Sequence, residues 1–135
     1  LLAVELFLTK DGELLVNEVA PRPHNSGHHT IESSPTSQFE QHIRAVLNLP
    51  LGSTRLLQPA IMLNILGEVG FQGPVRYIGT EEVCAMPEVF IHLYGKTHTR
   101  PFRKMGHVTI LGEDIQEVKA KANRIKELIK IKSQL

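Results

Sequence analysis

Residues 2–19 read LAVELFLTKDGELLVNEV, which is two short apolar segments joined by a turn. Apolar residues alternate along Leu2–Leu8 and along Leu14–Val19, as they do in half-buried strands. The pair Asp11-Gly12 between them is typical of a two-residue β-hairpin loop. We therefore expect an antiparallel hairpin at the start of the chain.

The hairpin carries one acid in each strand. With a two-residue loop, Glu5 lies directly opposite Glu18. Cross-strand neighbours have Cβ atoms about 4.5–5.5 Å apart, and like charges placed there destabilise a sheet. A cation between the carboxylates removes that cost, and oxygen ligands suit Mg²⁺ or Mn²⁺. We expect Glu5 and Glu18 to be metal ligands; the alternative is two glutamates that point into water.

The second strand leads into residues 21–28, which read PRPHNSGH. Two prolines restrict the backbone on either side of Arg22, and the segment is rich in groups that bind anions. A metal site beside such a segment favours phosphate chemistry. The candidate residues are Arg22, His24, Asn25, Ser26 and Gly27. A zinc site built from the histidines is disfavoured, because the prolines and Gly27 oppose a helix there and no cysteine is near.

These motifs resemble a known family. Residues 4–7 (VELF) and 17–28 (NEVAPRPHNSGH) are similar to the end of the ATP-grasp domain of the N5-carboxyaminoimidazole ribonucleotide synthetase family, which acts in purine biosynthesis. The likeness continues in SQFEQH at 37–42, YGK at 94–96 and RPFRKMGH at 100–107. A related family, the formate-dependent glycinamide ribonucleotide transformylases, shares the Pro-Arg-Pro-His core but typically continues with Asp-Thr-Gly-Met, so it matches less well.

The resemblance implies a ligase that uses ATP and bicarbonate to carboxylate 5-aminoimidazole ribonucleotide through carboxyphosphate. Glu5 and Glu18, helped by Asn17, would hold Mg²⁺ and the ATP phosphates. Arg22, His24 and Asn25 would bind bicarbonate and carboxyphosphate. Ser26 and Gly27 would lie beside the nucleotide substrate.

A basic loop later in the chain supplies a second candidate site. Lys96 and Arg103 flank residues 97–102 between two expected strands. A compact ammonium and a planar guanidinium together suit a phosphate monoester. The resemblance assigns both residues to the 5′-phosphate of the ribonucleotide; the alternative is an ordinary solvated loop.

The rest of the sequence predicts an α+β fold. Residues 1–52 are expected to be the C-terminal remnant of an ATP-grasp domain, an antiparallel hairpin plus a helix that begins after Ser37. That helix has an apolar stripe (Phe39, Ile43, Val46 and Leu47) expected to pack under the hairpin. Residues 53–135 are expected to form a small β-rich domain, with strands at 60–66, 75–78, 89–94 and 107–111 and a closing helix that begins after Asp114.

Composition narrows the setting. The chain has 135 residues, a net charge of +1 and one cysteine, Cys84, so an internal disulfide framework is excluded. No apolar run reaches membrane-spanning length, so no membrane partner is expected. Positive charge is confined to a few segments of the chain, so no nucleic-acid partner is expected either. We expect a fragment of a cytoplasmic, homodimeric enzyme that is inactive alone. The alternative function is a non-catalytic module that binds a phosphorylated ligand or dimerises.

Overall fold

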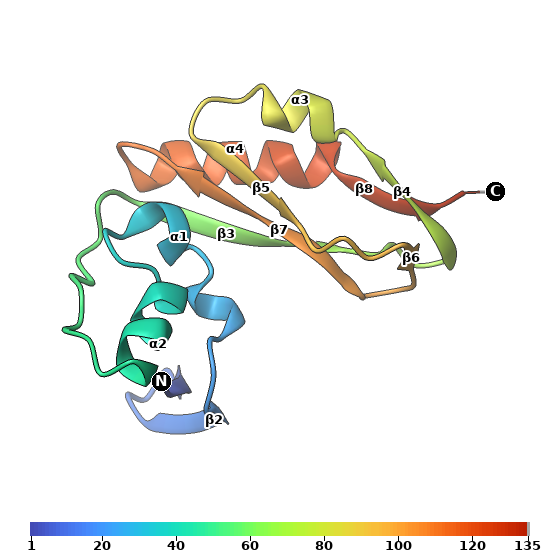
Figure 1. Ribbon diagram of the computed structural model, residues 1–135. Helices are drawn as coiled ribbons and strands as arrows, with labels where there is room; N and C mark the ends of the chain where they lie inside the picture. The colour runs from blue at the N-terminus through green and yellow to red at the C-terminus, as the bar shows by residue number, and fades with distance from the viewer. Residues whose placement is uncertain (135) are drawn as a thin grey trace. The chain divides into compact units, whose positions relative to one another are not determined.

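The computed structural model describes residues 1–134, which form two compact units that divide between Leu57 and Gln58 (Figure 1). Both units mix helices with antiparallel strands, which confirms the predicted α+β class. The assignment of residues 1–52 and 53–135 to two particular domains stays a prediction. No helix among the described residues is both long and apolar enough to cross a membrane.

Unit 1 opens with the predicted hairpin, β1 (Ala3–Leu8) and β2 (Leu14–Ala20). Its loop differs from the prediction. The amide of Thr9 donates to the carbonyl of Glu13 at 2.9 Å, and the amide of Gly12 donates to the carbonyl of Thr9 at 3.1 Å. The loop therefore has three residues, and Gly12 takes the left-handed conformation at φ 85° that ends such loops.

The extra loop residue shifts the pairing near the turn by one position. Leu8 pairs with Leu14, and Leu6 pairs with Val16. A β-bulge next to Leu6 then restores the predicted register, so that Glu5 faces Glu18. A one-residue slip would have moved one of the two acids to the other face of the ribbon. The bulge cancels that slip.

Short helices follow the hairpin. They are a 3₁₀ turn, η1 (Asn25–Gly27), then α1 (Thr30–Ser33) and α2 (Gln38–Val46). The hydroxyl of Ser37 accepts the amide of Glu40 at 3.2 Å, which confirms the predicted N-cap. The predicted packing of the α2 stripe is wrong for this chain, because its four apolar side chains are exposed (Phe39, Ile43, Val46 and Leu47).

Unit 2 contains two three-stranded antiparallel sheets. One has the order β3-β7-β5 (Ala60–Leu66, Lys104–Leu111 and Val89–Leu93), and the other has the order β6-β4-β8 (His98–Thr99, Gly73–Ile78 and Lys130–Ser133). The four strands predicted from sequence are present with small changes of bounds. The strands β6 and β8 were not predicted.

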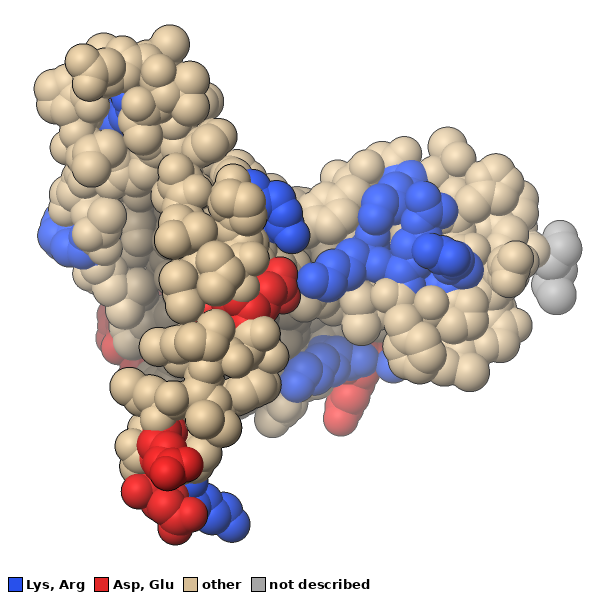
Figure 2. All heavy atoms as spheres, turned by 90° about the horizontal axis from the view of Figure 1, so that it is seen from below, with Lys and Arg blue, Asp and Glu red and all other residues tan. Residues whose placement is uncertain are grey.

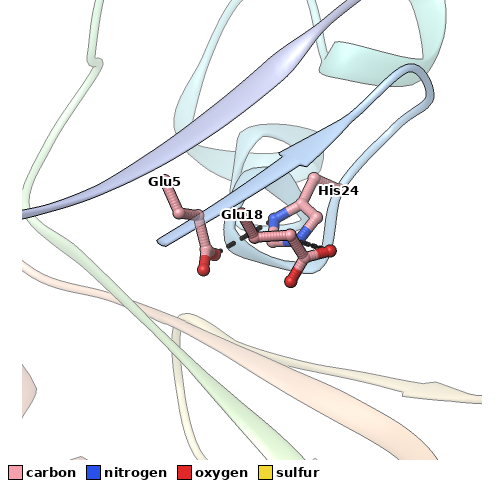
Figure 3. Close-up of side chains that lie close together, drawn as sticks. All are labelled: Glu5, Glu18 and His24. Carbon is pink, nitrogen blue, oxygen red and sulfur yellow. Dashed lines mark ion pairs between the residues drawn. The ribbon is translucent and has the colours of Figure 1, made fainter. Parts of the chain in front are cut away.

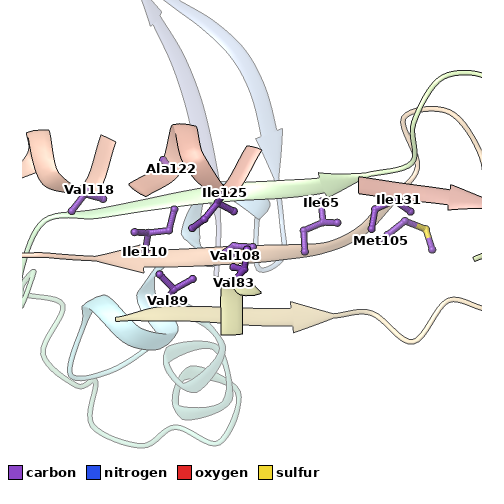
Figure 4. Close-up of a cluster of buried hydrophobic side chains, with 10 residues drawn as sticks. All are labelled: Ile65, Val83, Val89, Met105, Val108, Ile110, Val118, Ala122, Ile125 and Ile131. Carbon is purple, nitrogen blue, oxygen red and sulfur yellow. The ribbon is translucent and has the colours of Figure 1, made fainter. Parts of the chain in front are cut away.

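The closing helix α4 (Ile115–Leu128) covers β3 and β7, and the short helix α3 (Thr80–Cys84) lies against α4 and β5. Between these layers lies a core of buried side chains, shown in Figure 4. It includes Val108 and Ile110 from β7 and Val118 and Ile125 from α4, all at most 1% exposed. The apolar face of α4 is therefore the face that closes unit 2, as expected of the predicted closing helix.

The N-terminal cap of α4 can be tested directly. The Asp114 carboxylate accepts the amides of Gln116 and Glu117 at 2.7 and 3.0 Å. We expect Asp114→Ala to lower the free energy of unfolding by about 1 kcal/mol, because two helix-terminal N–H groups lose their partner. Asp114→Asn, which keeps an accepting oxygen, is the control for urea denaturation. Equal losses in the two variants would contradict the capping role.

Candidate functional site

The two acids of the hairpin meet a histidine from the segment that follows it. Nδ1 of His24 lies 3.2 Å from Oε1 of Glu5, and Nε2 lies 3.5 Å from Oε1 of Glu18. Figure 3 shows the imidazole between the two carboxylates, with one ring nitrogen toward each. The histidine is buried, whereas the carboxylates are open to solvent, with side chains 35% and 50% exposed. The site therefore combines a buried imidazole with two carboxylates that solvent can reach.

The β-bulge adds a fourth group to this face. At a bulge, two successive residues oppose one residue of the partner strand. Here Asn17 is the extra residue beside Glu18, and its side-chain amide donates to Oε2 of Glu5 at 3.1 Å. The bulge thus gathers Asn17 with both acids, as the sequence-based assignment of these residues to one site requires.

The side chains fit a divalent cation. Glu5, Glu18 and His24 each offer one ligand atom, and the three atoms lie within 4.8 Å of one another. Mg²⁺ holds ligands at about 2.0–2.1 Å, so donors on opposite sides of the ion are about 4.2 Å apart. Small side-chain movements would close the site around an ion. Two carboxylates suit Mg²⁺ or Mn²⁺, and an added imidazole favours Mn²⁺.

The segment 21–28 is ordered by its own hydrogen bonds. The guanidinium of Arg22 donates to the carbonyl of Pro23 at 3.1 Å and is exposed. Nδ1 of His24 lies 2.8 Å from Oγ of Ser26 and accepts that residue's amide at 3.4 Å, which caps the turn η1. Asn25 begins η1, and the amide of His28 donates to its carbonyl at 3.1 Å. Of the predicted residues of this segment, His24 contacts the acidic pair, and Ser26 contacts His24.

The basic loop of unit 2 is also held by main-chain bonds. Nζ of Lys96 donates to the carbonyl of Lys104, and Arg103 donates to the carbonyl of His98 at 2.8 Å. The loop is tied to Gly67, whose amide donates to the carbonyl of Arg103 at 2.9 Å. A Cβ at Gly67 would lie 2.2 Å from the carbonyl oxygen of Arg100, so this close approach requires glycine.

Figure 2 shows Lys and Arg side chains gathered over the end of unit 2 where β6 lies. Beside them, His92 and His107 stack with ring centroids 4.4 Å apart, and the hydroxyl of Tyr94 lies 2.9 Å from Nδ1 of His107. Burial raises the pKa of Tyr94 above 10.0, so its phenol is neutral near pH 7. Its ring supports the ammonium of Lys96, which lies 5.6 Å from the ring centroid.

Lys96 and Arg103 lie in unit 2, whereas Arg22 and Gly27 lie in unit 1. That the two groups meet around one ribonucleotide stays a prediction.

Comparisons with known proteins identify the relatives of this chain. Residues 1–39 match the ATP-grasp domain, and residues 60–121 match the phosphoribosylaminoimidazole carboxylase C-terminal domain. The N5-carboxyaminoimidazole ribonucleotide synthase of Bacillus subtilis is 53% identical over 121 residues, which cover 87% of this chain and 30% of that protein. The chain is similar to this family along most of its length.

Solved structures agree. The N5-carboxyaminoimidazole ribonucleotide synthetase of Thermotoga maritima has 57% identity and a TM-score of 0.94, over 98% of this chain and 37% of that one. The Aspergillus clavatus enzyme, solved with ADP and 5-aminoimidazole ribonucleotide, has 38% identity and a TM-score of 0.82, over 93% and 34%. The chain thus spans about a third of the length of these relatives. The family confirms the sequence-based resemblance and does not favour the transformylase alternative.

Metal binding by the acidic pair can be tested in the full-length protein that contains this chain. We expect Glu18→Gln to weaken Mn²⁺ binding by at least about tenfold, since loss of groups that only support a ligand already costs about 10–100-fold. Titration followed by electron paramagnetic resonance measures the affinity. Glu13→Gln, on the same hairpin but outside the cluster, is the control. Unchanged Mn²⁺ affinity in Glu18→Gln would overturn the assignment.

Proposed function

We propose that this chain is the C-terminal part of an enzyme that carboxylates 5-aminoimidazole ribonucleotide with bicarbonate and ATP. The product would be N5-carboxyaminoimidazole ribonucleotide, formed through carboxyphosphate, in purine biosynthesis. The observation that carries the proposal is the cluster of Glu5, Glu18 and His24 at the start of the Pro-Arg-Pro-His segment. A module that only binds phosphate has no need of two carboxylates on one face.

The acidic residues and the residues of the Pro-Arg-Pro-His segment would have different roles. Glu5 and Glu18 would hold the cation, with the amide of Asn17 steadying Glu5. When bound, Mg²⁺ would offset the negative charge on the ATP phosphates and on the phosphoryl group in transfer. Arg22, His24 and Asn25 would orient bicarbonate and then carboxyphosphate; positioning of two reactants can lower a barrier by about 7–11 kcal/mol at best.

The imidazole of His24 is placed for a double role. It lies between the two carboxylates, so it can keep them apart before a cation binds. The two carboxylates are open to solvent, and an anionic reactant would approach from that side. Ser26, whose hydroxyl contacts His24, and Gly27 would line the adjoining part of the nucleotide site.

Lys96 and Arg103 would bind the 5′-phosphate of the ribonucleotide. Their main-chain bonds hold both cations on a loop of fixed shape before the ligand arrives. Pre-arranged donors lose less side-chain entropy when they bind a phosphate. The parent enzyme would be a cytoplasmic homodimer; sedimentation of the full-length protein tests the dimer.

The reaction itself is tested with the full-length protein. We expect bicarbonate-dependent ATP hydrolysis that is stimulated by 5-aminoimidazole ribonucleotide. The 135-residue chain alone should show none, because it spans only about a third of its relatives. Release of ADP in a coupled assay measures both. Turnover by the isolated chain would overturn the claim that its active site is incomplete.

The phosphate clamp gives a more selective test. Lys96→Ala or Arg103→Ala should raise the KM for the ribonucleotide by about tenfold or more, since one charge-assisted hydrogen bond contributes about 1.5–3 kcal/mol. The KM for ATP should change little. Lys119→Ala removes an exposed lysine from α4 and is the control. Equal changes of KM for both substrates would show that the loop only supports the fold.

A further inference from the structure

Gln38 is the first residue of α2, and its side chain forms hydrogen bonds with both the amide and the carbonyl of His24. Its Oε1 accepts the amide of His24 at 2.9 Å, and its Nε2 donates to the carbonyl of His24 at 2.7 Å. One side-chain amide therefore satisfies both main-chain polar groups of His24, as a neighbouring strand would. Such a pair of bonds fixes both the position and the orientation of that residue's backbone.

The same amide reaches further along the segment. Nε2 of Gln38 also lies 2.9 Å from Nδ1 of His28, so both of its N–H groups and its oxygen have partners. The amide of Gln38 donates to Oγ1 of Thr30 at 2.9 Å, and that hydroxyl donates to the carbonyl of Gly27 at 2.6 Å. The segment from His24 to His28 thus folds around one glutamine.

Gly27 completes the enclosure. A Cβ built at Gly27 would lie 2.5 Å from Oε1 and 2.7 Å from Cδ of Gln38, closer than real Cβ contacts. The glycine lets the backbone lie directly against the amide. A side chain at this position would therefore displace the Gln38 amide, although the φ of Gly27 is not in the left-handed region.

These bonds matter because the hairpin alone does not fix the imidazole. Both carboxylates that face it are partly exposed, and they lie on a ribbon whose apolar side chains are largely exposed as well. His24, in contrast, is only 8% exposed. The anchor that sets where its ring meets Glu5 and Glu18 comes from α2.

We propose that Gln38 is a positioning residue for the active site, which holds His24 between the two carboxylates and shapes the anion-binding segment. The proposal rests on the proposed function above. Gln38 would touch no reactant. It would act through the backbone of His24 and through Gly27, so its loss should impair use of bicarbonate more than binding of the ribonucleotide phosphate by unit 2.

The same helix supplies a matched control. Gln41, one turn later, makes the same two bonds with Gly52: its Nε2 donates to the carbonyl at 2.7 Å, and its Oε1 accepts the amide at 3.0 Å. Its partner lies in the connection that follows α2, away from the acidic cluster. Gln38→Met and Gln41→Met therefore remove equivalent amide clamps, and only one of them holds the site.

The experiment compares both variants in the full-length enzyme. We expect Gln38→Met to lower kcat/KM for bicarbonate by about 10–100-fold, the usual effect of removing a group that orients a ligand or catalytic residue. Its KM for the ribonucleotide should stay within about threefold of wild type. Gln41→Met should keep kcat/KM for bicarbonate and KM for the ribonucleotide within about threefold of wild type, even if its melting temperature falls as far as that of Gln38→Met.

A second variant covers the case in which Gln38→Met does not fold. Gln38→Asn keeps an amide at the start of α2 but withdraws it by one methylene, and we expect the same selective loss. Wild-type protein without bicarbonate-dependent ATP hydrolysis would overturn the proposed function. If the wild type is active but the Gln38 variants behave like Gln41→Met, the positioning role of Gln38 is overturned and the proposed function is not.

Discussion

The repulsion between Glu5 and Glu18 is the constraint on which unit 1 depends. A short ribbon holds the two carboxylates on one face, where each raises the cost of the other's charge. The chain brings polar partners from both sides: Asn17 from the bulge and the buried ring of His24 from the following segment. This arrangement suits a candidate cation site.

The two units differ in how they are stabilised. Unit 2 encloses a continuous apolar core between its sheet and α4, whereas in unit 1 the hairpin and α2 leave most of their apolar side chains exposed. A two-stranded ribbon alone is at best marginally stable in water, and exposed apolar faces of this kind mark contact surfaces. We expect the further segments of the longer relatives to supply the surface that covers them. Such a surface would also account for the α2 stripe, which forms one helical face as predicted but is exposed among the residues that the structure describes.

Local sequence rules predicted the elements that depend on local chemistry. The caps Ser37 and Asp114 begin their helices as expected, because one side-chain oxygen decides each start. The hairpin loop was predicted one residue too short, since Asp-Gly suits both loop lengths and the choice depends on the strands. The facing of Glu5 and Glu18 was nevertheless right, because a bulge that no local pattern shows compensates the error. The strand β8 was missed, since Lys130–Ser133 is short, charged and paired only with distant β4.

The site residues reveal a second limit of sequence reasoning. The motif at 37–42 was correctly predicted to begin a helix. Its first glutamine, Gln38, also binds the backbone of His24, and the spacing of residues alone does not show that contact. The basic loop of unit 2 follows the same principle, because Gly67 anchors the backbone beside Arg103. In both places hydrogen bonds hold the main chain of a candidate site residue, from Gln38 in α2 at His24 and from Gly67, just after β3, at Arg103. Bonds of this kind can fix the backbone of a candidate site residue whether its side chain is buried, as at His24, or half-buried, as at Arg103.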